Sequence, residues 1–246
     1  MKKGIYVLPN LVTVCSTFCG FYAIISSFKG NYIYAAWAIM IASIFDGLDG
    51  KIARLTHSTS KFGVELDSLS DVISFGVAPG VLIYTWALQP FGRIGWVGAF
   101  LFVVCGALRL ARYNVQAETS EAKYFTGLPI PAAAVTIGAF VLFYEELWKD
   151  REVRTYLVVV LTYLLAFLMV STVRYHSIKE FEDSKRSPFL VLVGAVLVLI
   201  VILMHPTVML FVACITYVTW GMVEGVVMYK KRSAAHVVVK EQKQQP

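Results

Sequence analysis

The sequence contains two close pairs of aspartates, Asp46 with Asp49 and Asp67 with Asp71. The first pair is three residues apart and the second pair four, so on helices each pair lies on one face. Carboxylates that face one another repel, and each costs free energy when it leaves water. Hard divalent cations, Mg²⁺, Mn²⁺ or Ca²⁺, relieve both penalties because they prefer carboxylate oxygen. The pattern therefore predicts a metal site; the alternative is interfacial aspartates that merely reach water.

The residues between the two acidic pairs suit a phosphorylated ligand. Four carboxylates can hold two divalent ions about 4 Å apart, an arrangement that clamps a phosphoryl group during transfer. Arg54 adds a permanent cation suited to a diphosphate. Gly50, Ala53 and Gly63 keep this face shallow, so a ligand can approach the backbone closely. Close helix packing through small residues is the alternative explanation for either glycine.

We expect membrane helices to hold these residues in place. Hydrophobic residues make up 58% of the 246 residues and charged residues only 15%, whereas a soluble domain has about 25% charged residues. This composition excludes a disordered chain and an ordinary soluble enzyme, and it predicts an all-α, polytopic membrane helical bundle forming a single domain over residues 1–246. About eight apolar segments are long enough to span a bilayer: residues 11–28, 32–49, 64–88, 94–113, 128–147, 155–175, 189–204 and 207–228.

The distribution of basic residues orients this bundle. With eight spans both termini lie on one side, and 17 of the 22 lysine and arginine residues fall there. The positive-inside rule makes that side cytoplasmic. The acidic pairs lie at the same ends of the second and third segments, so the expected site, residues 46–71, faces the cytoplasm. The basic tail over residues 230–246 is expected to be flexible, against anionic lipid headgroups or in water.

These residues carry a resemblance to a known family. The pattern Asp46-x2-Asp49-Gly50-x2-Ala53-Arg54-x8-Gly63-x3-Asp67-x3-Asp71 is similar to the full signature of the CDP-alcohol phosphotransferases, with every position and gap in agreement. Within that family the chain most resembles the integral-membrane phosphatidylserine synthases, through residues 8–13, 65–79, 106–114 and 125–131. The resemblance covers about the first 135 residues.

The resemblance implies a role for each matched residue. Asp46, Asp49 and Asp67 would hold the metals, and Asp71 would be both ligand and general base. The donor CDP-diacylglycerol would be bound by Asn10, Thr13, Gly50, Ala53, Arg54, Ser60 and Gly63. Asn10 could instead cap the first helix, and Ser60 the third. The implied cofactors are two divalent cations, Mg²⁺ or Mn²⁺, with Ca²⁺ possible.

The implied reaction moves a phosphatidyl group from CDP-diacylglycerol to L-serine and releases CMP by direct displacement. Other acceptors (glycerol 3-phosphate, inositol phosphate or choline) and an archaeal ether-lipid donor are alternatives with the same chemistry. An ion or metal transporter is the alternative from a different class, but its carboxylates should lie near the membrane midplane.

A site that selects serine, the acceptor that the resemblance implies, should offer a fixed cation for its carboxylate. Arg109 and Arg112 lie three residues apart at the cytoplasmic end of the fourth segment, at the depth of the aspartates. An arginine can hold a carboxylate bidentately, so one or both could bind serine. Contact with the donor phosphates and anchoring to headgroups are the alternatives. The expected partners are these substrates, membrane lipids and a second copy of the chain in a homodimer, with no nucleic acid; the expected location is the cytoplasmic membrane.

Overall fold

The computed structural model describes residues 7–56, 58, 60–118, 127–147, 156–171 and 205–223. All regular structure within these ranges is helical, which confirms the predicted all-α class. The elements in chain order are α1 (Val7–Phe28), α2 (Tyr32–Leu55), α3 (Lys61–Asp71), η1 (Val72–Val77), α4 (Ala78–Ile83), η2 (Tyr84–Leu88), η3 (Gln89–Phe91), α5 (Arg93–Glu118), α6 (Ile130–Leu147), α7 (Tyr156–Val170) and the helix Pro206–Val223.

Six stretches of the described chain are helical, long and apolar enough to cross a membrane. They are Val7–Phe28, Tyr32–Leu55, Lys61–Phe91, Arg93–Gln116, Ile130–Leu147 and Pro206–Val223. The shorter apolar helix α7 corresponds to the expected sixth span. The expected span over residues 189–204 and the tail over residues 230–246 lie outside the described residues, so the number eight stays a prediction. Helices dominate because a backbone in lipid must satisfy its hydrogen bonds within its own segment.

The third span is longer than the sequence suggests and is not uniform. It runs from Lys61 to Phe91, and two turns of π-helix interrupt it, η1 directly after Asp71 and η2 after Ile83. A π-turn bonds residue i to i+5 and so accommodates one extra residue, and such turns occur often at functional sites. The apolar pattern of residues 64–88 gives no sign of them.

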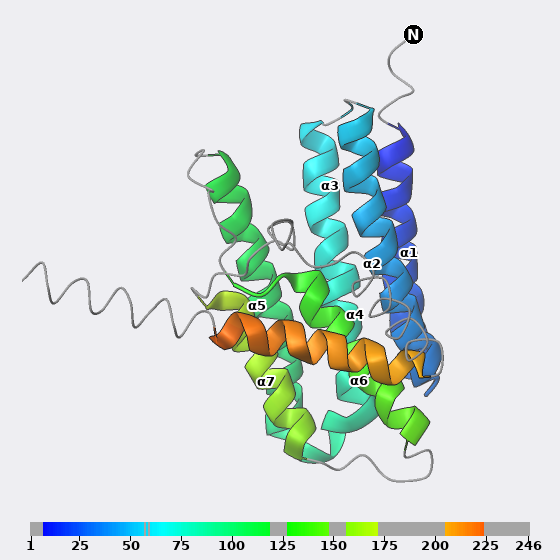
Figure 1. The fold of residues 1–246 in the computed structure, drawn as a ribbon, viewed down its shortest axis with the longest axis vertical. Helices are drawn as coiled ribbons and strands as arrows, with labels where there is room; N and C mark the ends of the chain where they lie inside the picture. Colours follow the sequence, from blue (N-terminus) through cyan, green and yellow to red (C-terminus); the bar gives the residue numbers. More distant parts are fainter. Residues whose placement is uncertain are drawn as a thin grey trace, which may run out of the picture.

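The first three helices form the part of the bundle that carries the acidic residues. Figure 1 shows α1, α2 and α3 side by side, with α1 packed along α2 and also against α3 and η1. The contact between α1 and η1 is close: a Cβ added to Gly20 would lie 2.6 Å from Ser74 Cα. Small residues at such interfaces allow membrane helices to approach each other.

Hydroxyl groups follow the same α1 interface toward the aspartates. Ser74 donates to the Ser16 carbonyl at 3.1 Å, and Thr17 donates to the Ser70 hydroxyl at 2.8 Å. Ser70 in turn donates to the Thr13 carbonyl at 3.3 Å. These bonds fix the axial position of α3 and η1 against α1, and therefore the depth of Asp67 and Asp71.

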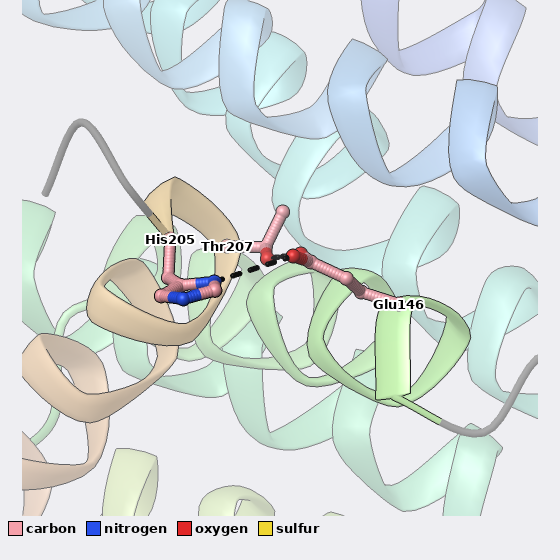
Figure 2. A network of polar contacts seen from close by, with 3 residues as sticks. All are labelled: Glu146, His205 and Thr207. Carbon is pink, nitrogen blue, oxygen red and sulfur yellow. Dashed lines mark hydrogen bonds and ion pairs between the residues drawn. The ribbon is translucent and has the colours of Figure 1, made fainter.

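The helix Pro206–Val223, orange in Figure 1, crosses α5, α6 and α7 at a steep angle to α1, α2 and α3. Its first residues contact the end of α6, as Figure 2 shows: His205 Nδ1 lies 3.9 Å from Glu146 Oε1, and the Thr207 hydroxyl donates to Glu146. Further along, the Phe211 ring stacks on Phe143 with centroids 4.7 Å apart. The helix is thus anchored on α6.

Candidate active site

The four aspartates converge where α2 and α3 lie beside each other. Asp46, Asp49 and Asp67 each offer a carboxylate oxygen, and these three atoms lie within 4.8 Å of one another. Asp71 joins the group through a side-chain hydrogen bond with Asp46. The structure therefore brings together all four residues that the spacing placed on one face of each helix.

The cluster has the donor chemistry that a divalent cation requires. Asp49 is buried, with 5% of its surface exposed. Asp67 Oδ1 is also buried, and it has no hydrogen-bond partner among the described residues. A buried carboxylate oxygen without a partner carries a desolvation cost that a bound cation would offset. The residues present thus fit a hard divalent ion held by carboxylate oxygen.

Thr13 on α1 holds one of these carboxylates in place. Its hydroxyl donates to Asp49 Oδ2 at 2.8 Å, and both residues are buried. The hydroxyl interface between α1, α3 and η1 fixes the backbone of Thr13 relative to Ser70, one residue before Asp71. A single set of contacts therefore links the Asp49 carboxylate on α2 to the acidic face of α3.

A cavity of about 310 Å³ opens directly beside the carboxylates. It is lined by Asp49 and Asp67 together with every residue expected to bind the donor: Asn10, Thr13, Gly50, Ala53, Arg54, Ser60 and Gly63. These residues come from α1, α2, α3 and the link between α2 and α3. The structure therefore assembles the whole expected binding set around one space.

The two glycines of the motif have different surroundings. A Cβ added to Gly50 would meet no atom within 4 Å, although Gly50 lines the cavity. A Cβ added to Gly63 would lie 3.2 Å from Asn10 Oδ1 and from Ser60 Oγ. Gly50 therefore keeps space open for a ligand, whereas Gly63 serves close packing of α3 against α1.

For Asn10 and Ser60 the alternative to donor binding is helix capping, and the two residues differ in this respect. Residue 10 lies inside α1, which is helical from Val7, so Asn10 is not the cap of that helix and the capping interpretation is wrong. Ser60 does cap α3, because its Oγ accepts the Gly63 N–H at 3.0 Å. Ser60 lines the cavity as well, so the cap also places its hydroxyl beside the ligand space.

Arg109 and Arg112 share α5 but have different environments. Arg109 is 8% exposed and interacts electrostatically with Asp71. Its Nε has no hydrogen-bond partner within the described part of the chain. Arg112 instead donates to the Val170 carbonyl at 3.1 Å, at the end of α7. Only Arg109 thus joins the acidic site; Arg112 binds the end of a neighbouring helix.

Sequence reasoning missed four residues that line the cavity: Pro9, Ser58, Val64 and Tyr113. Tyr113 comes from α5 and follows Arg109 by four residues, so the two share a helix face, and they interact electrostatically. The adjacent Asn114 donates to Ser68 Oγ at 2.9 Å, which holds α5 against α3 beside Asp67. The i, i+4 spacing from Arg109 is the signal that could have identified Tyr113.

The comparison with protein families is consistent with this site. The family model for CDP-alcohol phosphatidyltransferases matches residues 6–174, more than half of the chain. This region includes all four aspartates and every residue that lines the cavity. The helix Pro206–Val223 lies beyond the match.

Curated relatives span most of the chain. A CDP-diacylglycerol–serine O-phosphatidyltransferase of Helicobacter pylori is 39% identical over 230 residues, 92% of this chain and 94% of the relative. The protein of the same name from another strain of that species is 43% identical over 199 residues, 80% of this chain and 83% of the relative. The archaetidylserine synthase of Methanothermobacter thermautotrophicus is 47% identical over 144 residues, 57% of this chain and 60% of the relative.

Proposed function

The chain belongs to the CDP-alcohol phosphatidyltransferase family, and we propose that it is the member that transfers a phosphatidyl group from CDP-diacylglycerol to L-serine. The products are phosphatidylserine and CMP. The observation that carries the proposal is the convergence of the four aspartates beside a cavity lined by the entire expected donor-binding set. Membership in a family of transferases leaves the alternative of an ion or metal transporter without support.

We propose that the donor's CDP group occupies the cavity of about 310 Å³, with the diphosphate toward Asp49 and Asp67. Arg54 is exposed at this cavity, so its cation can meet the diphosphate from the water side. Gly50 leaves the wall open, and Thr13 and Ser60 offer hydroxyl groups. The diacyl tails leave sideways into the bilayer.

Asp46, Asp49, Asp67 and Asp71 would hold two divalent cations, Mg²⁺ or Mn²⁺. When bound there, such cations neutralise charge on the diphosphate and on the CMP leaving group. The chain's own contribution is to fix these carboxylates in advance, through the bond from Thr13 to Asp49 and through the α1–α3 interface.

Asp71 is the proposed general base. The serine hydroxyl oxygen attacks the phosphorus that carries the diacylglycerol, and Asp71 accepts the hydroxyl proton. The bond from that phosphorus to the bridging oxygen breaks, and CMP leaves with the electron pair. One in-line displacement of this kind needs no covalent enzyme intermediate.

Arg109 is the proposed anchor of the serine carboxylate. Arg109 is buried and interacts electrostatically with Asp71. Its Nε has no hydrogen-bond partner among the described residues. A guanidinium can hold a carboxylate through two parallel bonds, so serine bound there would bring its hydroxyl group toward the base. Both names among the relatives, serine O-phosphatidyltransferase and archaetidylserine synthase, also point to serine as acceptor. Arg112 donates to the Val170 carbonyl instead, so the proposal places the serine carboxylate on Arg109.

The site is proposed to face the cytoplasm, with both termini on the same side, in a homodimer in the cytoplasmic membrane. The support is the excess of lysine and arginine on that side and the resemblance to the family.

The decisive experiment is CMP release by the purified chain in detergent micelles containing CDP-diacylglycerol and Mg²⁺ or Mn²⁺. L-serine, glycerol 3-phosphate, inositol phosphate and choline are supplied one at a time. Release that depends on L-serine supports the proposal. Release that depends on another alcohol reassigns the acceptor, and no release with any of them refutes the transferase proposal.

A further inference from the structure

The helix Pro206–Val223 lies outside the region that the family model matches, yet it packs on α6, which in turn packs on α2. Its inward residues include Phe211, Cys214, Tyr217 and Val218. Phe211 lies against Phe140 and Phe143, with ring centroids 5.4 and 4.7 Å apart. The Cys214 thiol has a side-chain hydrogen bond with Thr136 on α6, and Val218 is only 2% exposed. These contacts fix the rotation of the helix about its own axis.

That rotation places Tyr217 on the inward side of the helix, within electrostatic range of Arg109. Tyr217 is partly buried and adjoins the buried core, and its phenol interacts electrostatically with the Arg109 guanidinium. Arg109 interacts in the same way with Asp71. Arg109 thus interacts electrostatically both with Tyr217 on the last described helix and with the proposed base Asp71.

We propose that Tyr217 is a specificity-determining residue for the acceptor: its hydroxyl group and the Arg109 guanidinium together bind the carboxylate of the incoming amino acid. This inference rests on the proposed function. A carboxylate has two oxygens that each accept hydrogen bonds, while an arginine and a tyrosine hydroxyl can both donate. In a site of low polarity such charge-assisted bonds discriminate strongly against an alcohol that lacks the carboxylate. The helix beyond the family match would therefore help Arg109 of the matched region to select the acceptor.

The test uses the full chain with Tyr217→Phe, which keeps the ring and its packing and removes only the hydroxyl group. We expect the KM for L-serine to rise roughly three- to tenfold, the effect of losing about one hydrogen bond. The kcat and the KM for CDP-diacylglycerol should stay at wild-type values. Tyr163→Phe is the matched control, because the Tyr163 hydroxyl donates to the Ile94 carbonyl at the opposite end of α5; it should change none of these constants.

A second measurement separates a contact with the carboxylate from a general loss of structure. Serinol has the amine and hydroxyl groups of serine without the carboxylate. Tyr217→Phe should reduce the preference for L-serine over serinol, and its effect should not add to that of Arg109→Lys in the double variant. Additive effects, or an unchanged preference, would overturn the inference even if Tyr217→Phe lowers stability.

The outcomes distinguish the inference from the proposed function. If the wild-type chain releases no CMP with L-serine, the proposed function fails and this inference falls with it. If the wild type uses serine and Tyr217→Phe retains wild-type constants, only the inference fails. A rise in the KM for CDP-diacylglycerol alone would reassign Tyr217 to the donor and also overturn it.

Discussion

The Thr13 hydroxyl group donates a hydrogen bond of 2.8 Å to Asp49 Oδ2 across the interface between α1 and α2. Thr13→Val keeps the side-chain shape and removes this donor, so we expect the apparent affinity for Mg²⁺ or Mn²⁺ to fall about 10- to 100-fold, as for other residues that orient a metal ligand. Thr13→Ser should retain most of the affinity. Metal titrations of CMP release and of thermal stability measure both variants; a wild-type affinity in Thr13→Val would show that Asp49 needs no such support.

Asp67→Asn should nearly abolish turnover, because it removes one charge from a cluster whose oxygens lie within 4.8 Å. In the metal-free state this variant should be at least as stable as the wild type, since one repelling charge is gone. The increase in Tm that metal gives the wild type should disappear, and EDTA should inactivate the wild type reversibly. Differential scanning fluorimetry and CMP release make the comparison; full activity of the EDTA-treated wild type would contradict a metal-assisted reaction.

Asp71→Asn should lower the rate of transfer by about 10²- to 10⁴-fold, which is the usual effect of losing a positioned base. Binding of CDP-diacylglycerol should change much less, because Asp71 is not among the residues that line the donor cavity. Single-turnover kinetics measure the rate of transfer, and a separate binding measurement gives the affinity for CDP-diacylglycerol. A variant with more than half of the wild-type turnover would remove Asp71 from the role of base.

Gly50→Ala should raise the KM for CDP-diacylglycerol, because the added methyl group enters the cavity without touching any protein atom. Its effect on folding should be neutral or stabilising, by at most about 1 kcal/mol, since alanine favours a helix over glycine. Gly47→Ala is the matched control: it lies on the same helix, also meets no atom within 4 Å, and does not line the cavity. Equal KM values for the two variants would show that the donor does not approach Gly50.

Arg109→Lys should raise the KM for L-serine several-fold, because a lysine ammonium cannot hold the serine carboxylate through two parallel hydrogen bonds as a guanidinium can. Arg112→Lys should leave that KM unchanged and lower Tm, since Arg112 bonds the Val170 carbonyl. Steady-state kinetics and thermal melts of both variants decide between the two positions. If Arg112→Lys raises the serine KM and Arg109→Lys does not, the assignment of the two arginines is reversed.

The acidic part of the site could be predicted from the sequence because its four aspartates lie on two helices joined by a short link. The i, i+3 and i, i+4 spacings alone placed Asp46, Asp49, Asp67 and Asp71 on facing sides, because helical periodicity fixes which side chains share a face. The residues expected to bind the donor came from the family resemblance, and all of them line the cavity.

The parts that could not be predicted depend on contacts between distant segments. Arg109 and Arg112 are both arginines at nearly the same depth in the predicted membrane. They differ because the end of α7 lies beside Arg112, whose side chain bonds the Val170 carbonyl, while Arg109 Nε has no hydrogen-bond partner among the described residues. Tyr217 interacts electrostatically with Arg109 although the two residues are far apart in the sequence, and no periodicity predicts this. The glycines Gly50 and Gly63 differ only in what lies opposite, an open cavity or the side chain of Asn10.

The π-turn η1, directly after Asp71, has a consequence for how this chain tolerates changes in length. A residue removed from an ordinary α-helix rotates everything beyond it by about 100°. Within Val72–Val77 the backbone already forms a wider π-turn, which holds one residue more than an α-turn. Losing one residue there would convert this segment to regular α-helix. The half of the span beyond η1 would then keep its face toward α1, and the acidic half would keep its register through Ser70. Insertions and deletions among homologues should therefore be found at η1 and be absent between Gly63 and Asp71.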